Sequence, residues 1–119
     1  MRDFRELKVW EKAHRLTLAI YKATIQFPRD ETYGLTSQIK RSSSSVAFNI
    51  AEGCGRDGDA ELRRFLQIAM GSASELQYQL LLARDLRFLP DGQYAQLESD
   101  VVEVKRMLTS FIQKLKADR

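Results

Sequence analysis

The sequence contains few of the residues that build disulfides, metal centres or catalytic sites. Among its 119 residues there is one cysteine, Cys54, and one histidine, His14. A lone cysteine excludes an internal disulfide and fits a reducing compartment. Glu11 and His14 have the Glu-x-x-His spacing of bundle metal sites, but a second such pair would need a second histidine. We therefore expect no metal site, no cofactor and no catalytic site.

Long apolar runs and a strong charge bias are also missing. No apolar run reaches the roughly 20 residues that a membrane-spanning helix needs, and the charged N-terminal segment lacks the apolar centre of a signal peptide. We expect a cytoplasmic protein with no membrane partner. Lys and Arg number 19 against 16 Asp and Glu, which gives a formal net charge of +3. This mildly basic balance permits an anionic partner such as nucleic acid but does not require one.

Proline and glycine are scarce, and their positions divide the chain. The two prolines and six glycines leave four long segments in which apolar residues recur every three or four positions. Strand-like alternation is absent. The short connections between the segments force consecutive helices to lie antiparallel. The sequence predicts one all-α domain over residues 1–119, an antiparallel up-down-up-down four-helix bundle with helices at about 6–26, 32–52, 59–86 and 92–116.

Polar and small residues form a second stripe on the second and third predicted helices. Counting away from the glycine-rich connection between them places Ser42 near Gly71 and Ser72, and Ser45 near Gln67. The same count brings Arg41 within reach of Glu75. The candidate interhelical polar network comprises Gln38, Arg41, Ser45, Asn49, Glu52, Ser72 and Glu75. Two interpretations remain open: a hydrogen-bonded network inside the bundle that sets the helix register, which we favour, or a binding site.

Two glycines carry specific expectations. We expect Gly53 to cap the second helix in a left-handed conformation. A glycine within a helix costs about 0.5–1 kcal/mol relative to alanine, so Gly71 suggests close packing of the second and third helices, and we expect Gly71→Leu to destabilise the fold. The connection Gly53–Gly58 lacks the Gly-Lys-Ser/Thr ending of a phosphate loop and is expected to be a turn.

Three arginines fall near the connection between the second and third helices. Arg56, Arg63 and Arg64 should lie close together at one end of the bundle. Arginine side chains suit phosphate groups, so this end is the candidate nucleic-acid contact. The same count from the connection also brings Glu52 within reach of Arg63 or Arg64.

Several spaced motifs resemble those of a known family, the four-helix bundle proteins encoded in intervening sequences of bacterial 23S rRNA genes. The resemblance runs nearly end to end. Its most specific parts are Leu7-Lys8-Val9-Trp10-x-Lys12-Ala13, Phe27-Pro28-x-x-Glu31-x-Tyr33-Gly34-Leu35-x-x-Gln38-Ile39-x-Arg41, Ser45-Val46-x-x-Asn49-Ile50-Ala51-Glu52-Gly53 and Phe65-Leu66-x-x-Ala69-x-Gly71-Ser72-x-x-Glu75-Leu76.

This resemblance implies a ring-like homopentamer and kinship with the accessory variability protein of diversity-generating retroelements, a basic pentamer that binds a reverse transcriptase and nucleic acid. The family itself offers no established activity. We expect a non-enzymatic oligomeric binding protein whose partner is RNA or a nucleic-acid-binding protein. The alternative is a protein–protein adaptor that binds no nucleic acid, and a third hypothesis is an enzyme that uses the polar stripe.

Overall fold

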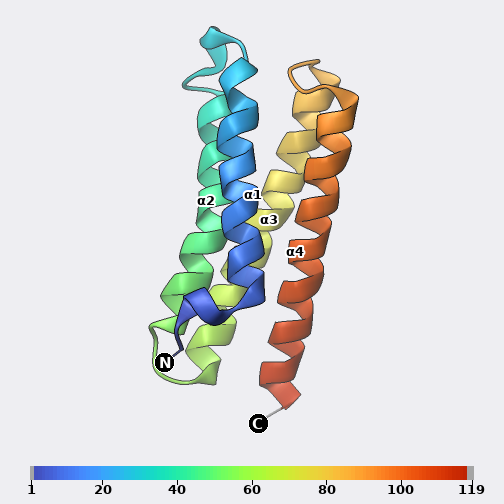
Figure 1. Ribbon diagram of the computed structural model, residues 1–119. Helices are drawn as coiled ribbons and strands as arrows, with labels where there is room; N and C mark the ends of the chain where they lie inside the picture. Colours follow the sequence, from blue (N-terminus) through green and yellow to red (C-terminus); the bar gives the residue numbers. More distant parts are fainter. Residues whose placement is uncertain (1, 118–119) are drawn as a thin grey trace.

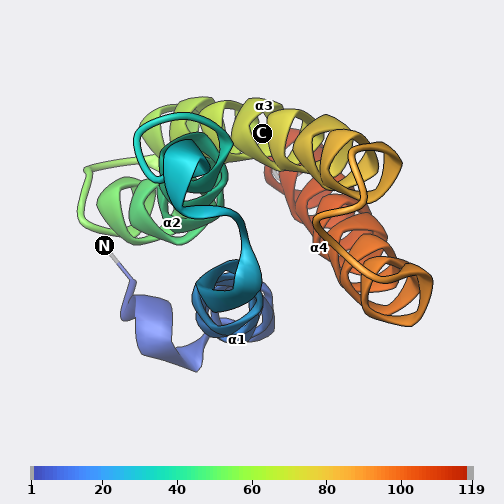
Figure 2. The same cartoon turned by 90° about the horizontal axis from the view of Figure 1, so that it is seen from above.

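Four long helices form an up-down-up-down bundle, as predicted. A computed structural model describes residues 2–117, and within them the helices are α1 (Lys8–Ala23), α2 (Leu35–Cys54), α3 (Asp59–Asp85) and α4 (Asp91–Ala117), with no strand. The bundle is 47 Å long (Figure 1). Seen from above, the helices follow one another around the bundle in chain order, so that α1 and α4 close it (Figure 2). We call the end with the N-terminus of α1 and the α2–α3 connection the lower end.

One apolar stripe on each helix supplies the core. On α1 the buried residues Val9, Ala13, Leu16 and Ile20 recur every three or four positions, and on α4 Leu97, Val101, Val104 and Leu108 do the same. This spacing puts the residues on one face of a helix. The core seals the bundle from end to end, so any binding site must lie on its surface or in the grooves between helices.

The first helix starts and ends inside its predicted bounds because its flanks adopt tighter turns. Phe4–Glu6 forms a 3-10 turn capped by the Asp3 carboxylate, which accepts from the Arg5 N–H at 3.0 Å. Leu7 is extended, and α1 begins only after it. At the other end the backbone tightens into a 3-10 turn at Thr24–Gln26 before the extended Phe27, which precedes proline.

The second helix begins three residues later than predicted and extends past its predicted end. A 3-10 turn at Arg29–Glu31 precedes it, and the Glu31 side chain caps α2 by accepting from the Leu35 N–H at 3.0 Å. The expected left-handed cap at Gly53 is wrong, because the helix continues through Gly53 to Cys54. The left-handed glycine is Gly58, whose φ of 86° allows the chain to turn into α3.

The role of Gly53 is to let α2 and α3 approach. A Cβ at this position would lie 2.9 Å from the Phe65 Cβ and 3.0 Å from the Leu62 Cδ1. Any side chain would therefore push the helices apart. The expectation that Gly71 marks close packing of α2 and α3 is wrong. Gly71 is exposed, and a Cβ there would have no atom within 4 Å.

Candidate functional site

The polar residues of α2 and α3 meet along a groove between the two helices. The hydroxyls of Ser45 and Ser72 lie 2.8 Å apart. Ser42 donates to Glu75 Oε1 at 3.1 Å, and the Asn49 side chain donates to the Ser45 carbonyl at 2.8 Å. The structure thus links three of the seven network candidates, Ser45, Asn49 and Ser72, through hydrogen bonds, whereas Glu75 bonds to Ser42 in the same groove.

The predicted register between these helices is wrong by about one helical turn. Ser45 meets Ser72 rather than Gln67, and Ser42 meets Glu75 rather than Ser72. Side chains lean toward the N-terminus of their helix, so those of α2 lean away from the connection and those of α3 lean toward it. Both tilts move the contacting residues toward higher numbers in each helix. Residue counting from the connection ignored this tilt and the two extra residues of α2.

The groove is open to solvent, which corrects its expected place inside the bundle. Its volume is about 420 Å³, and it is lined by Gln38, Arg41, Ser42, Ser45, Ser72 and Glu75. Gln38, Arg41 and Glu75 are exposed. The expected pair of Arg41 with Glu75 does not form within the described residues, because Glu75 accepts from Ser42 instead. Arg41 and Glu75 therefore present opposite charges on one surface.

Exposed apolar side chains lie on the same two helices, next to this groove in sequence. Phe48, on the turn after Ser45, is 72% exposed. Ile68 lies one turn before Ser72, and Tyr78 lies one turn after Glu75; both are also exposed. Together with the groove and Gly71, these three side chains define what we call the α2/α3 face. Large exposed apolar residues gathered around a polar groove are typical of interaction surfaces.

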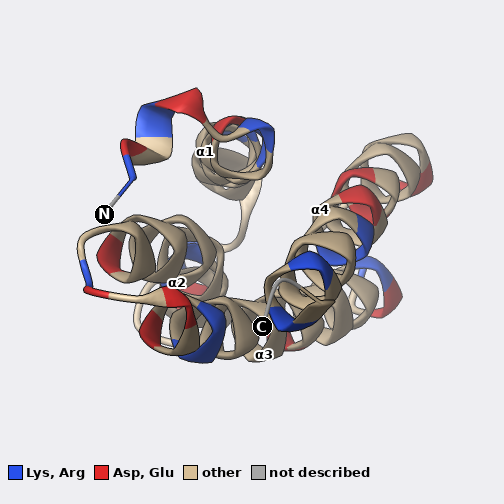
Figure 3. Cartoon of the chain, turned by 90° about the horizontal axis from the view of Figure 1, so that it is seen from below, with Lys and Arg blue, Asp and Glu red and all other residues tan. Residues whose placement is uncertain are grey.

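The lower end brings two of the three arginine candidates together. The guanidinium carbons of Arg56 and Arg64 lie 5.1 and 4.5 Å from the centre of the Phe65 ring. Arg63 contributes differently, because its Nη1 atom is buried. Lysines and arginines alternate with acidic residues over this end (Figure 3). The lower end is therefore not a uniformly basic patch.

Both exposed arginines of this pair are held by glutamates. Arg64 Nε donates to Glu61 at 3.1 Å, and this hydrogen bond lowers the pKa of the Glu61 carboxyl below its usual range. Arg56 pairs with Glu52 at 3.2 Å. The expected pairing of Glu52 with Arg63 or Arg64 is therefore wrong: the partner is Arg56, four residues along the chain, which shares a face with Glu52 once α2 extends to Cys54.

The remaining reactive side chains form no cluster. Cys54 is buried, and burial raises the pKa of its thiol, which keeps it protonated. His14 is exposed and stacks on Trp10, with 5.0 Å between the ring centres. Across residues 2–117 no group of three His, Cys, Asp or Glu side chains is arranged to hold a metal ion.

Sequence comparison assigns this arrangement to a family. The profile described as 23S rRNA-intervening sequence protein matches residues 5–110, which is most of the chain. The chain belongs to this family. The matched range includes all of α1, α2 and α3, the groove with its serines, and both arginines that flank Phe65.

A solved structure of a related protein has the same architecture. It is a protein of unknown function from the S23 ribosomal protein family of Bacteroides thetaiotaomicron, with 27% identity and a TM-score of 0.79. The similarity covers 88% of this chain and 95% of the other. No curated protein matches the chain. The family assignment thus provides a fold but no activity.

In the described part of the chain, no helix is apolar over enough of its length to cross a bilayer.

Sequence reasoning missed two features of the surface. Phe48 and Ile68 are as apolar as core residues, and their exposure depends on which side of each helix faces its neighbours. The grooves between α1 and α4 were also missed, because these helices are first and last in the chain and no connection gives their spacing. Phe48 carried one usable signal, since it falls next to the polar stripe and outside the apolar stripe of α2.

Proposed function

We propose that this member of the 23S rRNA-intervening sequence protein family is a non-enzymatic, self-associating protein that binds RNA. The observation that carries self-association is the α2/α3 face. Phe48, Ile68 and Tyr78 leave apolar surface exposed, and covering it would be favourable by about 25 cal/mol for each Å² removed from water. Five subunits is the number that the resemblance to the family implies.

The charges and backbone of the α2/α3 face suit a second copy of the chain. Arg41 and Glu75 lie on the same groove without pairing with each other, so Arg41 of one copy can meet Glu75 of another. Such a charge-assisted contact is among the stronger polar interactions at an interface. The open position at Gly71 allows a neighbouring backbone or side chain to approach α3 closely.

Light scattering on Phe48→Glu tests the self-association. We expect the unchanged protein to form oligomers and Phe48→Glu to shift it to monomers, because a buried charge at the contact is unfavourable. Tyr33→Glu is the matched control: Tyr33 is even more exposed than Phe48 but lies away from the α2/α3 face. A monomeric unchanged protein, or equal effects of the two substitutions, would contradict the proposal.

Arg56 and Arg64 are the proposed RNA contacts. Their ion pairs with Glu52 and Glu61 lie on the surface, where such pairs contribute about 0–1 kcal/mol, so a phosphate can replace the carboxylate at little cost. Several copies in one assembly act together on one RNA and raise its avidity. We also propose that the protein is related to the accessory variability protein of diversity-generating retroelements and that it is located in the cytoplasm.

Fluorescence anisotropy of a labelled structured RNA, titrated at several salt concentrations, tests RNA binding. We expect affinity to fall steeply with rising salt and to weaken in the double variant Arg56→Ala, Arg64→Ala. The matched double variant Arg29→Ala, Arg84→Ala removes equal charge at the opposite end; Arg84 also pairs with a carboxylate and lies 4.6 Å from the Tyr94 ring centre. No binding at low salt would favour the protein adaptor.

A further inference from the structure

A second surface, on the opposite side from the α2/α3 face, has an apolar floor. It is the lower groove between α1 and α4, with a volume of about 400 Å³. Leu7, Val9, Met107 and Phe111 contribute its apolar walls. Leu7, Met107 and Phe111 are half-buried rather than buried, so part of their apolar surface still contacts solvent.

Four cations surround this floor. They are Arg2, Lys8, Arg106 and Lys114, and no carboxylate lines the groove within residues 2–117. Arg106 is held by Glu103, with its Nε 2.9 Å from a carboxylate oxygen. Lys8 and Lys114 stand on opposite sides of the groove, one on each helix, and both are exposed. The rim therefore carries positive charge from both helices.

The topology explains why the chain leaves this groove open. The lower end holds the start of α1 and the end of α4, and no connection ties these two helices together there (Figure 1). Leu7 enters α1 in an extended conformation and lines the floor. The α2–α3 connection closes the other side of the lower end, whereas Met107 and Phe111 stay half-exposed in the groove, with the Arg2 guanidinium over the Phe111 ring.

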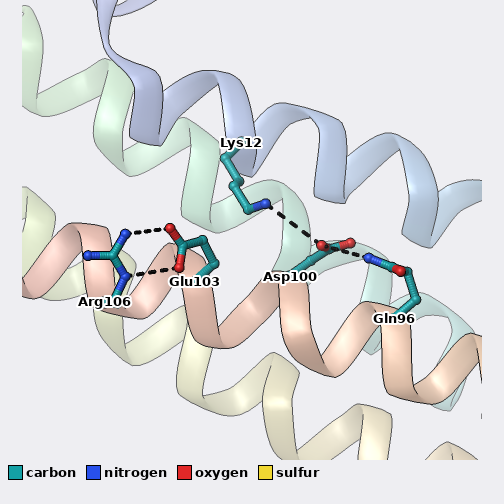
Figure 4. A network of polar contacts seen from close by, with 5 residues as sticks. All are labelled: Lys12, Gln96, Asp100, Glu103 and Arg106. Carbon is teal, nitrogen blue, oxygen red and sulfur yellow. Dashed lines mark hydrogen bonds and ion pairs between the residues drawn. The ribbon is translucent and has the colours of Figure 1, made fainter.

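Higher along the same interface the charges are mixed, because Lys8, Lys12 and Arg15 line it together with three carboxylates. Lys12 on α1 approaches Asp100 on α4 at 3.8 Å, Gln96 donates to Asp100 at 3.1 Å, and Glu103 holds Arg106 (Figure 4). Glu11, Asp100 and Glu103 all line this middle section. The purely cationic lining is therefore confined to the lower groove, and a long polyanion that continued along the interface would meet carboxylates as well as cations.

We propose that the lower groove is a docking site for a short acidic peptide segment of a partner protein, with apolar anchor residues that enter the floor. The cationic rim complements carboxylates, and the aliphatic and thioether floor receives apolar side chains, which phosphates and sugars do not supply. The aromatic ring of the floor is covered, because the Arg2 guanidinium lies 5.5 Å from the Phe111 ring centre. It is not a free platform for stacking bases.

The size of the groove sets the extent of the peptide. A volume of about 400 Å³ is at the lower end of the range for ligand pockets, roughly 300–1,000 Å³. The groove therefore receives a few side chains and not the whole face of a long helix. The carboxylates of the middle section make a longer acidic stretch less favourable there than in the lower groove.

A labelled twelve-residue peptide of glutamates, with leucine and phenylalanine four positions apart, is a direct probe. We expect it to bind in fluorescence anisotropy, and we expect Lys8→Glu, Lys114→Glu to weaken binding by about tenfold or more, as loss of charge complementarity does at protein interfaces. The control double variant Arg29→Glu, Lys40→Glu changes the net charge by the same amount at positions away from the groove. Its affinity for the peptide should stay within about twofold of that of the unchanged protein. A peptide with alanine at both anchor positions should bind weakly to the unchanged protein. The protein variant Met107→Gln should likewise bind the original peptide weakly.

Three results with the peptide would overturn the proposal: no binding at low salt, equal loss of affinity in the two double variants, or equal binding of the peptide with alanine anchors. A fourth would be an RNA of twelve uridines that binds more tightly than the peptide and loses its binding in the double variant Lys8→Glu, Lys114→Glu. The last result would assign the groove to nucleic acid. Circular dichroism verifies that the variants fold. Light scattering separates this site from self-association, because the Lys8 and Lys114 variant should assemble like the unchanged protein whether or not the peptide binds.

Discussion

The α2–α3 and α1–α4 pairs are both antiparallel neighbours in one bundle, yet they pack differently. Between α2 and α3 the backbones approach so closely at Gly53 that a Cβ would lie 2.9 Å from that of Phe65, and serine hydroxyls bond directly across the groove. Both pairs have grooves of similar volume, about 420 Å³ between α2 and α3 and 400–480 Å³ between α1 and α4, but across α1 and α4 the contact is made by long side chains, with Lys12 reaching Asp100 at 3.8 Å. Small residues permit the first arrangement, and long charged side chains keep the second apart.

The difference separates residues that hold the fold from residues that remain available to partners. Where two helices are joined by a short connection and have glycine or serine between them, most of the facing surface is used within the chain. The outer rim of that contact, the α2/α3 face, then exposes Phe48 and Tyr78. Where the helices are joined only through the rest of the bundle, the interface itself stays open. Both surfaces are candidate binding sites, for different geometric reasons.

Replacing Gly53 should have the largest effect on this comparison. Gly53→Val places a branched side chain against the Phe65 Cβ and the Leu62 carbonyl oxygen, which lies 3.3 Å from the position of the new Cβ. Overpacking of this kind costs about 1–3 kcal/mol, and more where backbone must move. We expect the free energy of unfolding, measured in urea, to fall by at least about 2 kcal/mol.

Gly71 provides the control within the same helix pair. Gly71→Ala should keep or raise stability, by up to about 1 kcal/mol, because alanine favours the helix and the site is open. Equal losses at Gly53 and Gly71 would show that the helices approach at Gly71 too and that the close contact lies elsewhere. Gly71→Leu should fold but impair assembly if the α2/α3 face joins subunits.

The sequence predicted the helices better than their contacts. Periodic apolar residues and the few glycines and prolines located all four helices, with α3 and α4 correct to within one residue at each end. Local signals suffice there because a helix is defined by neighbours in the chain. Glu31 shows the limit: its cap on Leu35 needs a 3-10 turn that no apolar pattern reveals.

The groove residues were identified by type, but their partners were not. Ser45, Asn49 and Ser72 do meet, and Glu75 lies on the same groove, because polar residues at helical spacing share a face. Which residues pair depends on side-chain tilt and on where α2 ends. The predicted register was wrong by one helical turn, so it placed Ser42 near Ser72, whereas Ser42 contacts Glu75 in the structure. Whether Gly53 or Gly71 marks the close approach depends on the same register. The spacing of α1 and α4 depends on all four helices and has no local signal.

Removing one serine hydroxyl should have a moderate effect. Ser72→Ala deletes the hydroxyl that lies 2.8 Å from Ser45 Oγ, in a half-buried position. A hydrogen bond of this kind contributes about 0.5–1.5 kcal/mol, and we expect a loss within that range in thermal unfolding. Ser74→Ala, at an exposed position on the same helix, should change stability by less than about 0.5 kcal/mol. Similar losses for both would place the effect in helix propensity and not in the groove.

The smallest effect should come from the ion pair between α1 and α4. Lys12→Ala removes the Lys12–Asp100 contact, which is long at 3.8 Å and partly exposed on both sides. Such pairs contribute about 0–1 kcal/mol, so we expect a loss in that range that disappears at 1 M salt, where the screening length falls to about 3 Å. A double-mutant cycle with Asp100→Ala isolates the pair from the rest of each side chain. A coupling energy above that of the Ser45–Ser72 pair would show that the open interface is held as firmly as the closed one, and the contrast between the two helix pairs would no longer hold.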